Sequence, residues 1–457
     1  MCCDIKTVTQ TLLQNVVQRQ HQPSNSCQPT SGRTLNMFKP SQFLLLGQQL
    51  HHSPPAKPIR VLAGVATALN PTKTYTSLVP PPRHFKNNIA VHHRRNIHLT
   101  RSQQNPLNTM AANKEYRLLC LENPLLDIQA FGDEALLNKY GLKANDAILA
   151  EEKHLPLYED LLNNYDAKLI AGGAAQNTAR GAQYMLPSNS VVYLGGVGDD
   201  KYAAILRDAV KKAGLRVEYR VDPKEPTGRC GVVITGHNRS MCTELGAANH
   251  YDLEHLKSPE VWKLVENAEA YYVGGYHFTV SPPAIMELCK QAAEHNKPFI
   301  LSLSAPFIPQ FFKEPLDASA PYWDYVIGNE TEAEAYADSH DLGTKDVKEI
   351  AKALANLPKV NEKRKRVAII TQGTEPTIVA VQGEDKVSEY PVQEIAKEEI
   401  NDTNGAGDAF AGGFCAGILE GKSLEESVKM GQWLAKLSIK ELGPSYPFPK
   451  QTYPGSN

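Results

Sequence analysis

Short apolar runs alternate with longer amphipathic stretches from Glu115 to the end of the chain. Several runs are apolar at consecutive positions, which is typical of strands buried on both faces of a sheet. The predicted strands span residues 117–121, 191–195, 270–274, 299–303, 325–329 and 367–371. Stretches such as 201–213 and 285–295 lie between them and have helical spacing. The alternation predicts an α/β fold, a doubly wound and mainly parallel sheet flanked by helices and joined by right-handed crossovers.

Two segments interrupt this alternation. Residues 140–162 are polar and irregular, and residues 227–245 read as two short antiparallel strands joined by a turn near residues 236–238. We expect them to form a small β-rich layer beside the main sheet, which can act as a lid that shields a reacting group from water. The alternative is that both segments are ordinary loops.

The first 109 residues lack the periodicity of helix or strand, and residues 80–82 are three consecutive prolines. They carry 12 Lys and Arg but a single acid, whereas the remaining residues carry 36 Lys and Arg and 49 Asp and Glu. The formal net charge of -2 is therefore a cancellation. Because such a segment has too little apolar surface to offset the entropy cost of ordering, we predict that residues 1–109 are a disordered basic extension.

Three roles stay open for this extension. We favour one that the working protein does not need, because Met110 lies just before the first predicted strand and is a natural start for a compact domain. An organelle-targeting sequence, which is typically Arg-rich and acid-poor, comes second. A basic arm for nucleic acid or membrane comes third, since its charges are scattered and only Arg94 and Arg95 are adjacent.

The composition, ordinary for a soluble globular protein, also excludes several classes of protein. No stretch approaches the ~20 apolar residues of a membrane span, and the first residues lack the basic and apolar regions of a secretory signal. None of the eight cysteines forms a Cys-x-x-Cys pair, so the sequence predicts reduced thiols rather than a zinc site. We therefore expect a cytoplasmic protein, with a nuclear pool or organelle targeting by residues 1–109 left open.

The segment with the most chemical information is residues 402–414, Asp-Thr-Asn-Gly-Ala-Gly-Asp-Ala-Phe-Ala-Gly-Gly-Phe. It predicts a glycine-rich turn leading into a helix, where uncovered amides and the helix dipole favour an anionic oxygen. The amides of Gly405, Ala406 and Gly407 can hold a phosphoryl group, and Asp408 can accept a proton from a hydroxyl. The pattern is neither the dinucleotide-binding fingerprint nor the P-loop. An ordinary turn with a capping Asp is the alternative.

Residues 402–410 resemble the C-terminal signature of the ribokinase-like, or pfkB, family of carbohydrate and nucleoside kinases. The resemblance covers nearly everything from Leu118 to Tyr453 and does not extend before Met110. Further matching segments are residues 122–127, 171–180, 236–240, 303–308, 328–334, 431–435 and 443–447. The resemblance implies one ribokinase-like domain over residues 110–457, with a lid formed by about residues 127–171 and 225–250.

This resemblance also implies a set of nucleoside-binding residues. Asp127, which we expect at the end of the first strand, and Asn177 would bind the ribose. Gly172 and Gly173 would form the hinge on which the lid closes. Four residues would line the base pocket, namely Met241, Thr243, His277 and Phe307. His277 stands where many relatives carry a stacking Phe, and it titrates near neutral pH. Capping, tight turns and core packing are the structural alternatives for these positions.

A second set is implied on the ATP side, across the turn of residues 405–407. The residues expected there are Arg239, Asn329, Thr371, Gly373 and Gln432. Arg239, in the turn of residues 238–240, would approach the transferring phosphate when the lid closes, and a solvated surface Arg is the alternative. Asn329 and Glu332 resemble the family's Asn-x-x-Glu element, in which the carboxylate organises Mg²⁺ through water. A capped helix start explains the same pattern, and both roles can hold at once.

The reaction that the resemblance implies is transfer of the γ-phosphoryl group of ATP to the 5′-hydroxyl of adenosine. Asp408 would be the base, Mg²⁺ the metal, and the protein a monomer without nucleic-acid or membrane partners. A ribokinase-like sugar kinase is the closest alternative. A non-catalytic nucleoside-binding regulator and a nucleic-acid-binding protein led by residues 1–109 are the others. The intact turn of residues 405–408 argues against the regulator.

Overall fold

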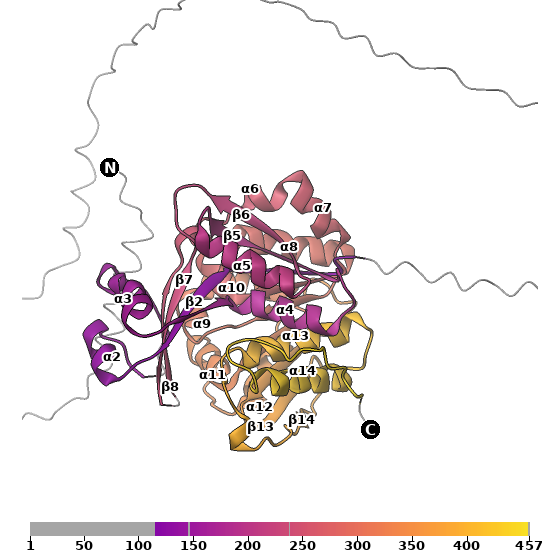
Figure 1. Ribbon diagram of the computed structural model, residues 1–457. Coiled ribbons are helices and arrows are strands. Elements are labelled where there is room, and N and C mark those ends of the chain that lie inside the picture. Colours follow the sequence, from indigo (N-terminus) through magenta and orange to yellow (C-terminus); the bar gives the residue numbers. More distant parts are fainter. Residues whose placement is uncertain (1–114, 145–146, 237, 456–457) are drawn as a thin grey trace, which may run out of the picture. The chain divides into compact units, whose positions relative to one another are not determined.

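The computed structural model describes residues 115–144, 147–236 and 238–455 (Figure 1). The predicted extension, residues 1–109, lies outside the described residues. Within the described part the strands form two sheets, one of nine strands in the order β14-β13-β12-β11-β10-β9-β1-β5-β6 and one of five in the order β3-β8-β7-β2-β4.

The nine-stranded sheet is the predicted doubly wound one. Its strands are β1 (Leu118–Leu121), β5 (Val191–Gly198), β6 (Arg216–Asp222), β9 (Ala270–Gly274), β10 (Phe299–Ser302), β11 (Tyr325–Asn329), β12 (Val367–Gln372), β13 (Glu375–Val381) and β14 (Ser388–Tyr390). The strands from β12 through β6 in the sheet order pair in parallel, and β13 and β14 add an antiparallel edge. All six predicted strands are present and parallel, so the α/β prediction is confirmed.

Helices cover both faces of this sheet, and each face has its own hydrophobic core. One face carries α4 (Ala174–Met185), α5 (Lys201–Lys212), α13 (Ala406–Leu419) and α14 (Leu424–Ser438). The other carries α6 (Leu253–Lys257), α7 (Pro259–Asn267), α8 (Pro282–His295), α9 (Phe307–Phe311), α10 (Lys313–Ser319), α11 (Glu330–Ser339) and α12 (Val347–Ala355). Short 3₁₀ turns are η2 (Glu152–His154), η3 (Gly246–His250), η4 (Gly275–Thr279), η5 (Ala320–Tyr322) and η6 (Lys397–Glu399).

The five-stranded sheet is the predicted second layer. It consists of β2 (Leu125–Phe131), β3 (Ala147–Leu149), β4 (Lys168–Gly172), β7 (Arg229–Thr235) and β8 (Asn238–Glu244), with α2 (Glu134–Tyr140) and α3 (Pro156–Asn164) beside it. A third hydrophobic core, which includes Ile128, Leu161 and Val233, joins these two helices to one sheet face. Because side chains alternate along a strand, Asp127 and Gln129 of β2 point to the opposite face.

Two expected positions change in this sheet. The first strand ends at Leu121, and Asp127 is the third residue of β2 in the second sheet rather than the end of the first strand. Arg239 lies inside β8, not in a turn. Asp127 changes place because Pro124 cannot donate a ladder hydrogen bond and separates two strands that the apolar pattern alone does not divide. Arg239 changes place because β8 starts at Asn238 and Arg239 pairs with Ile234 of β7.

The helix that carries the glycine-rich turn packs closely on its neighbour. A Cβ atom at Gly413 of α13 would lie 2.5 Å from the carbonyl oxygen of Met430 in α14. A side chain at this position would therefore force the two helices apart. The close approach packs the middle of α13 tightly against α14.

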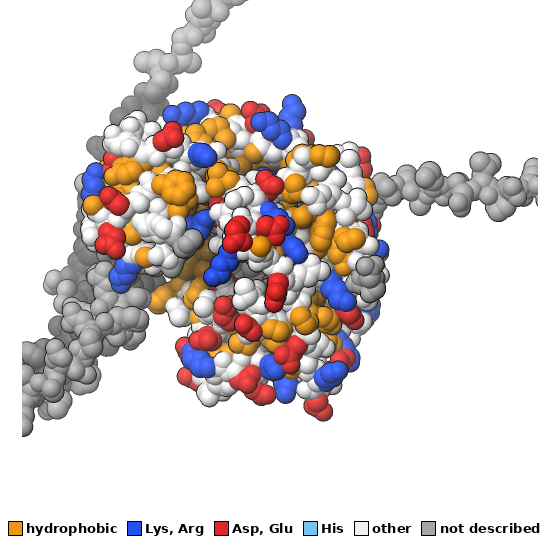
Figure 2. Space-filling model, turned by 60° about the horizontal axis from the view of Figure 1, so that its bottom comes forward, with side chains coloured by type: hydrophobic (Ala, Val, Ile, Leu, Met, Phe, Trp, Pro, Cys, Tyr) orange, Lys and Arg blue, Asp and Glu red, His pale blue; other side chains and the backbone are white. Residues whose placement is uncertain are grey.

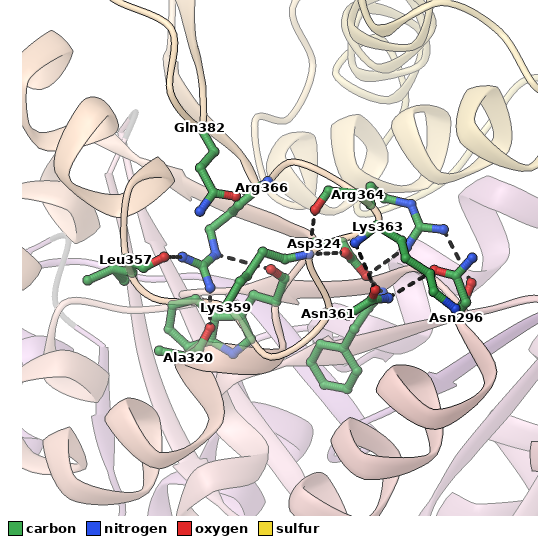
Figure 3. Close-up of polar contacts among 12 residues, drawn as sticks. Asn296, Ala320, Asp324, Leu357, Lys359, Asn361, Lys363, Arg364, Arg366 and Gln382 are labelled. Atoms are coloured by element: carbon green, nitrogen blue, oxygen red, sulfur yellow. Dashed lines mark hydrogen bonds and ion pairs between the residues drawn. The ribbon is translucent and has the colours of Figure 1, made fainter.

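Charged residues are buried together where β11 and β12 begin (Figure 3). Asp324 is 2% exposed, forms ion pairs with Lys359 and Arg364, and accepts a hydrogen bond from the N–H of Phe299. Arg366 is fully buried and donates to four backbone carbonyl oxygens, those of Ala320, Trp323, Leu357 and Pro358. Such partners are the condition under which charged groups tolerate burial.

Charges of both signs are interspersed over the face of the molecule shown in Figure 2. Among the described residues, no helix is both long and apolar enough to cross a membrane.

Candidate active site

The glycine-rich turn leads into α13 as the sequence predicts. Gly405 precedes the helix with a φ of 79°, a left-handed conformation that favours glycine. A Cβ atom there would also lie 2.6 Å from the Cβ of Pro444. The first N–H groups of a helix have no partner within it, so the start of α13 presents amides and the positive end of its dipole to an anion.

Asp408 lies in the first turn of α13 and meets a residue from the start of α4. Its Oδ2 atom accepts a hydrogen bond of 3.0 Å from Nδ2 of Asn177. Burial raises the pKa of Asp408 to about 6, and the hydrogen bond from Asn177 opposes that rise. Asp408 is therefore mainly ionised at neutral pH, as a proton acceptor must be, while its pKa lies close to the working range of a general base.

Asp127 lies at the same site, against the predicted hinge. A Cβ atom at Gly172 would come 2.5 Å from Oδ1 of Asp127, and Gly173 has a φ of 90°. The pKa of Asp127 is raised to about 7, mainly by burial and also by the negative charges of Asp408 and Asp402, while Arg180 opposes the rise. The structure thus brings together the predicted ribose carboxylate, the hinge glycines and the predicted base.

Carboxyl groups are concentrated around this point. The charge of Asp408 raises the pKa of Glu122, Asp127 and Glu332, each of which is also raised by its own burial. The raised pKa values mean that further negative charge is unfavourable here, so a cation would stabilise an incoming phosphate.

The predicted magnesium element forms a helix start. Asn329 caps α11 by accepting from the N–H of Glu332, and both carboxylate oxygens of Glu332 accept from Asn329 in return. Burial raises the pKa of Glu332 to about 7. Within the part of the chain that the structure describes, no group of three or more His, Cys, Asp or Glu side chains could hold a metal alone. Both oxygens of Glu332 already accept hydrogen bonds from Asn329, so this element is first of all a helix cap.

Arg239 has a partner that the sequence did not suggest. Its Nη2 lies 2.8 Å from Oδ1 of Asp402, a fully buried carboxylate in the glycine-rich turn. Gln129 of β2 also reaches Oδ2 of Asp402, at 3.4 Å. Asp402 in turn accepts from the N–H groups of Asn404 (2.8 Å) and Gly443 (3.0 Å). Sequence reasoning missed Gln129 and the role of Asp402, although Gln129 shares a strand face with Asp127.

Replacing Asp402 by Asn is expected to lower kcat/KM for ATP by roughly 10- to 100-fold, because charge-assisted hydrogen bonds to the turn and to Arg239 are weakened. Steady-state kinetics at saturating adenosine measure this. Glu425→Gln, which breaks the exposed pair of Glu425 with Lys429 in α14, is the matched control. Equal values for both variants would show that the turn does not depend on the charge of Asp402.

Two of the predicted base-pocket residues, His277 and Phe307, differ in their burial and in the rings that they contact. His277 is fully buried, its Nδ1 lies 3.0 Å from Oδ1 of Asn123, and its ring meets that of Tyr251 edge-on. Burial lowers the pKa of His277 to about 3, so the ring is neutral rather than titrating near neutral pH. Phe307, at the start of α9, is partly buried and packs against Tyr276 at 5.9 Å between ring centroids. Stacking of either ring on a base stays a prediction.

Met241 and Thr243 alternate on β8 and share a face with Arg239. Thr243 donates to Sγ of Cys230 at 3.3 Å, and both Met241 and Thr243 are partly buried. Their place on the inner face of the second sheet agrees with a pocket wall, and contact with a base stays a prediction.

On the predicted ATP side, the sheet makes two residues neighbours. Asn329 of β11 pairs in register with Thr371 of β12. Gly373 lies in the following turn with a φ of 58° and open space around its α-carbon. Gln432 of α14 donates to Oγ1 of Thr377 (3.1 Å) and to the carbonyl of Tyr390 (3.0 Å), so its amide joins the helix to β13 and β14. Contact of Gln432 with adenine stays a prediction.

Comparison with known proteins agrees with this geometry. Residues 134–451 match the model of the pfkB family of carbohydrate kinases, and the chain belongs to that family. It is 52% identical over 341 residues to the adenosine kinase of Schizosaccharomyces pombe, and this alignment covers 74% of this chain and 98% of the relative. It is 48% identical over 342 residues to the adenosine kinase of Saccharomyces cerevisiae, and this alignment covers 74% of this chain and 98% of that relative.

Solved structures give the same picture. The crystal structure of Anopheles gambiae adenosine kinase in complex with P1,P4-di(adenosine-5) tetraphosphate has a TM-score of 0.70 and 45% identity, and covers 72% of this chain and 99% of that one. Adenosine kinase from Schistosoma mansoni in complex with 2-fluoroadenosine has a TM-score of 0.70 and 35% identity, and the match covers 73% of this chain and 98% of that one.

Proposed function

We propose that this protein is an ATP-dependent adenosine kinase that forms AMP and ADP and so serves purine salvage. The observation that carries the proposal is the meeting of Asp408, at the amide-rich start of α13, with Asn177 beside the hinge glycines. The identity of about half the aligned residues to fungal adenosine kinases supports adenosine as the acceptor.

The proposed reaction assigns a task to each part of the site. Asp127 and Asn177 hold the ribose, so that the 5′-hydroxyl lies near Asp408. The oxygen of that hydroxyl attacks the γ-phosphorus, its proton passes to the Asp408 carboxylate, and the bond to the β-phosphate oxygen breaks to release ADP. The amides of residues 405–407 stabilise the charge on the transferring group.

Magnesium would enter this site with ATP. Glu332, close enough for Asp408 to raise its pKa, and Asn329 would hold its water ligands. The metal would neutralise the negative charge that builds up on the phosphates.

The second sheet is proposed to act as the lid, with the hinge at Gly172 and Gly173. Its support is that β2 and β8 both contact the glycine-rich turn through Asp402. We further propose a monomeric, cytoplasmic kinase whose working domain is residues 110–457. Support for this domain is that the family model matches residues 134–451, and that the relatives named above are covered over 98% of their length by 74% of this chain.

A substrate panel tests the proposed function. With Mg·ATP, the full chain is expected to release ADP with adenosine at a kcat/KM roughly 100-fold or more above that with free ribose or fructose, because contacts to the base add binding energy that the sugars lack. A preference for a free sugar would replace the proposal with a sugar kinase. Adenosine binding without any ADP release would instead identify a non-catalytic regulator.

A further inference from the structure

One buried carboxyl group near the site has no task in the proposed reaction. Glu122 directly follows β1 and is 1% exposed. Its Oε2 atom accepts a hydrogen bond of 2.8 Å from the N–H of Ala175, in the first turn of α4. Its Oε1 atom is also buried.

The backbone around Glu122 leaves room for this carboxyl group. A Cβ atom at Gly274, the last residue of β9, would lie 1.7 Å from Oε1 of Glu122. The carboxyl group therefore occupies the space that a side chain at residue 274 would fill. It connects the end of β1, the start of α4 and the junction of β9 with η4.

The protonation state of Glu122 follows from this environment. The pKa of Glu122 is raised to about 8, mainly by burial and also by the negative charge of Asp408. The N–H of Ala175, the backbone of Tyr276 and the hydroxyl of Ser304 oppose this rise. At neutral pH the group is therefore mainly the neutral acid.

A short path leads from Glu122 to the base. Ala175, which donates to Glu122, lies two residues before Asn177, and Nδ2 of Asn177 donates to Asp408. The hinge residue Gly173 precedes the same helix. We propose that Glu122 is a positioning residue for phosphoryl transfer, which holds the first turn of α4 so that Asn177 orients Asp408. This inference rests on the proposed function.

The surroundings of Glu122 give the proposal a pH signature. The titratable groups that interact with it are Cys120 of β1, Tyr193 of β5, Tyr272 of β9, Tyr276 of η4 and Asp408 of α13. Burial raises the pKa of the cysteine and of the three tyrosines, so these groups are neutral. As pH rises through about 8, Glu122 ionises and places a second negative charge near the ionised Asp408. Repulsion between the two carboxylates then disturbs the orientation of Asp408, and kcat falls.

Two substitutions in the full chain test this role. Glu122→Gln keeps an oxygen for the N–H of Ala175 and cannot ionise, so at pH 7 its kcat should stay within about threefold of wild type and its decline above pH 8 should disappear. Glu122→Leu removes the acceptor and should lower kcat by roughly 10- to 100-fold, with a smaller change in KM for adenosine, as expected for a misplaced reacting group. Glu260→Gln, at an exposed acid in α7, is the control.

The measurements are kcat and KM for adenosine and ATP between pH 5.5 and 9.5. A folded Glu122→Leu variant with wild-type kcat overturns the proposal. If that variant does not fold, the proposal is overturned by a Glu122→Gln variant that keeps the alkaline decline. A wild-type protein that does not phosphorylate adenosine refutes the proposed function together with this role, whereas active wild type with unaffected variants refutes this role alone.

Discussion

Replacing Asp408 by Asn is expected to lower kcat by roughly 10²- to 10⁴-fold, the range for loss of a general base. The amide keeps the shape of the side chain but cannot take the proton of the 5′-hydroxyl. Adenosine binding should be largely spared, because Asp127 and Asn177 are proposed to hold the ribose. Assays of ADP release at saturating substrates measure kcat, and isothermal titration calorimetry measures the affinity for adenosine.

The pH profile gives a second readout of the same residue. Because the pKa of Asp408 is raised to about 6, wild-type kcat should fall as pH falls through about 6, where the carboxylate takes up a proton. The residual activity of Asp408→Asn should lack this decline. Glu420→Gln, at the exposed end of the same helix, is the control and should behave as wild type. Unchanged turnover in Asp408→Asn would exclude Asp408 as the base.

Replacing Asp324 by Ala is expected to lower the free energy of unfolding by about 3–5 kcal/mol, the typical cost of removing one partner from a buried ion pair. Lys359, whose side chain is 2% exposed, would lose its carboxylate partner, and the N–H of Phe299 would lose its acceptor. Urea unfolding followed by circular dichroism measures the change. The residues of Figure 3 lie where β11 and β12 begin, while the site lies at the opposite strand ends, so kcat of the folded fraction should be unchanged.

The matched control for Asp324→Ala is an exposed ion pair in the same region. Lys365 and Glu384 pair at 3.0 Å with side chains 59% and 49% exposed, so Glu384→Ala should cost only about 0–1 kcal/mol. If the two variants lost similar free energies of unfolding, burial would not be the cause of the contribution that the Asp324 pair makes to stability.

Several features could be predicted from local sequence because their cause is local. Consecutive apolar residues such as those of β5 and β9 have to be buried on both faces, so the parallel sheet follows from the pattern. The glycine-rich turn was predictable because the left-handed conformation of Gly405 and the helix after it depend on neighbouring residues. The second β layer followed from the alternation in β7 and β8.

Other features could not be predicted because they depend on residues far apart in the chain. The sequence led to a surface or phosphate-facing Arg239, yet its partner Asp402 lies 163 positions away. The hydrogen bond of His277 to Asn123 spans a similar separation of 154 positions and keeps the ring buried and neutral. Nothing in the neighbourhood of either residue signals such a partner.

The amino-acid sequence by itself determined the class of fold, the glycine-rich turn before α13 and the place of Asp408 in the first turn of that helix, since short-range backbone preferences decide these. Only the tertiary structure decided which sheet holds Asp127, which carboxylate meets Arg239, and that Glu122 lies against the start of α4. The physical reason is that pairing and pKa shifts arise from burial and from charges brought close by packing, and neither exists until the chain has folded.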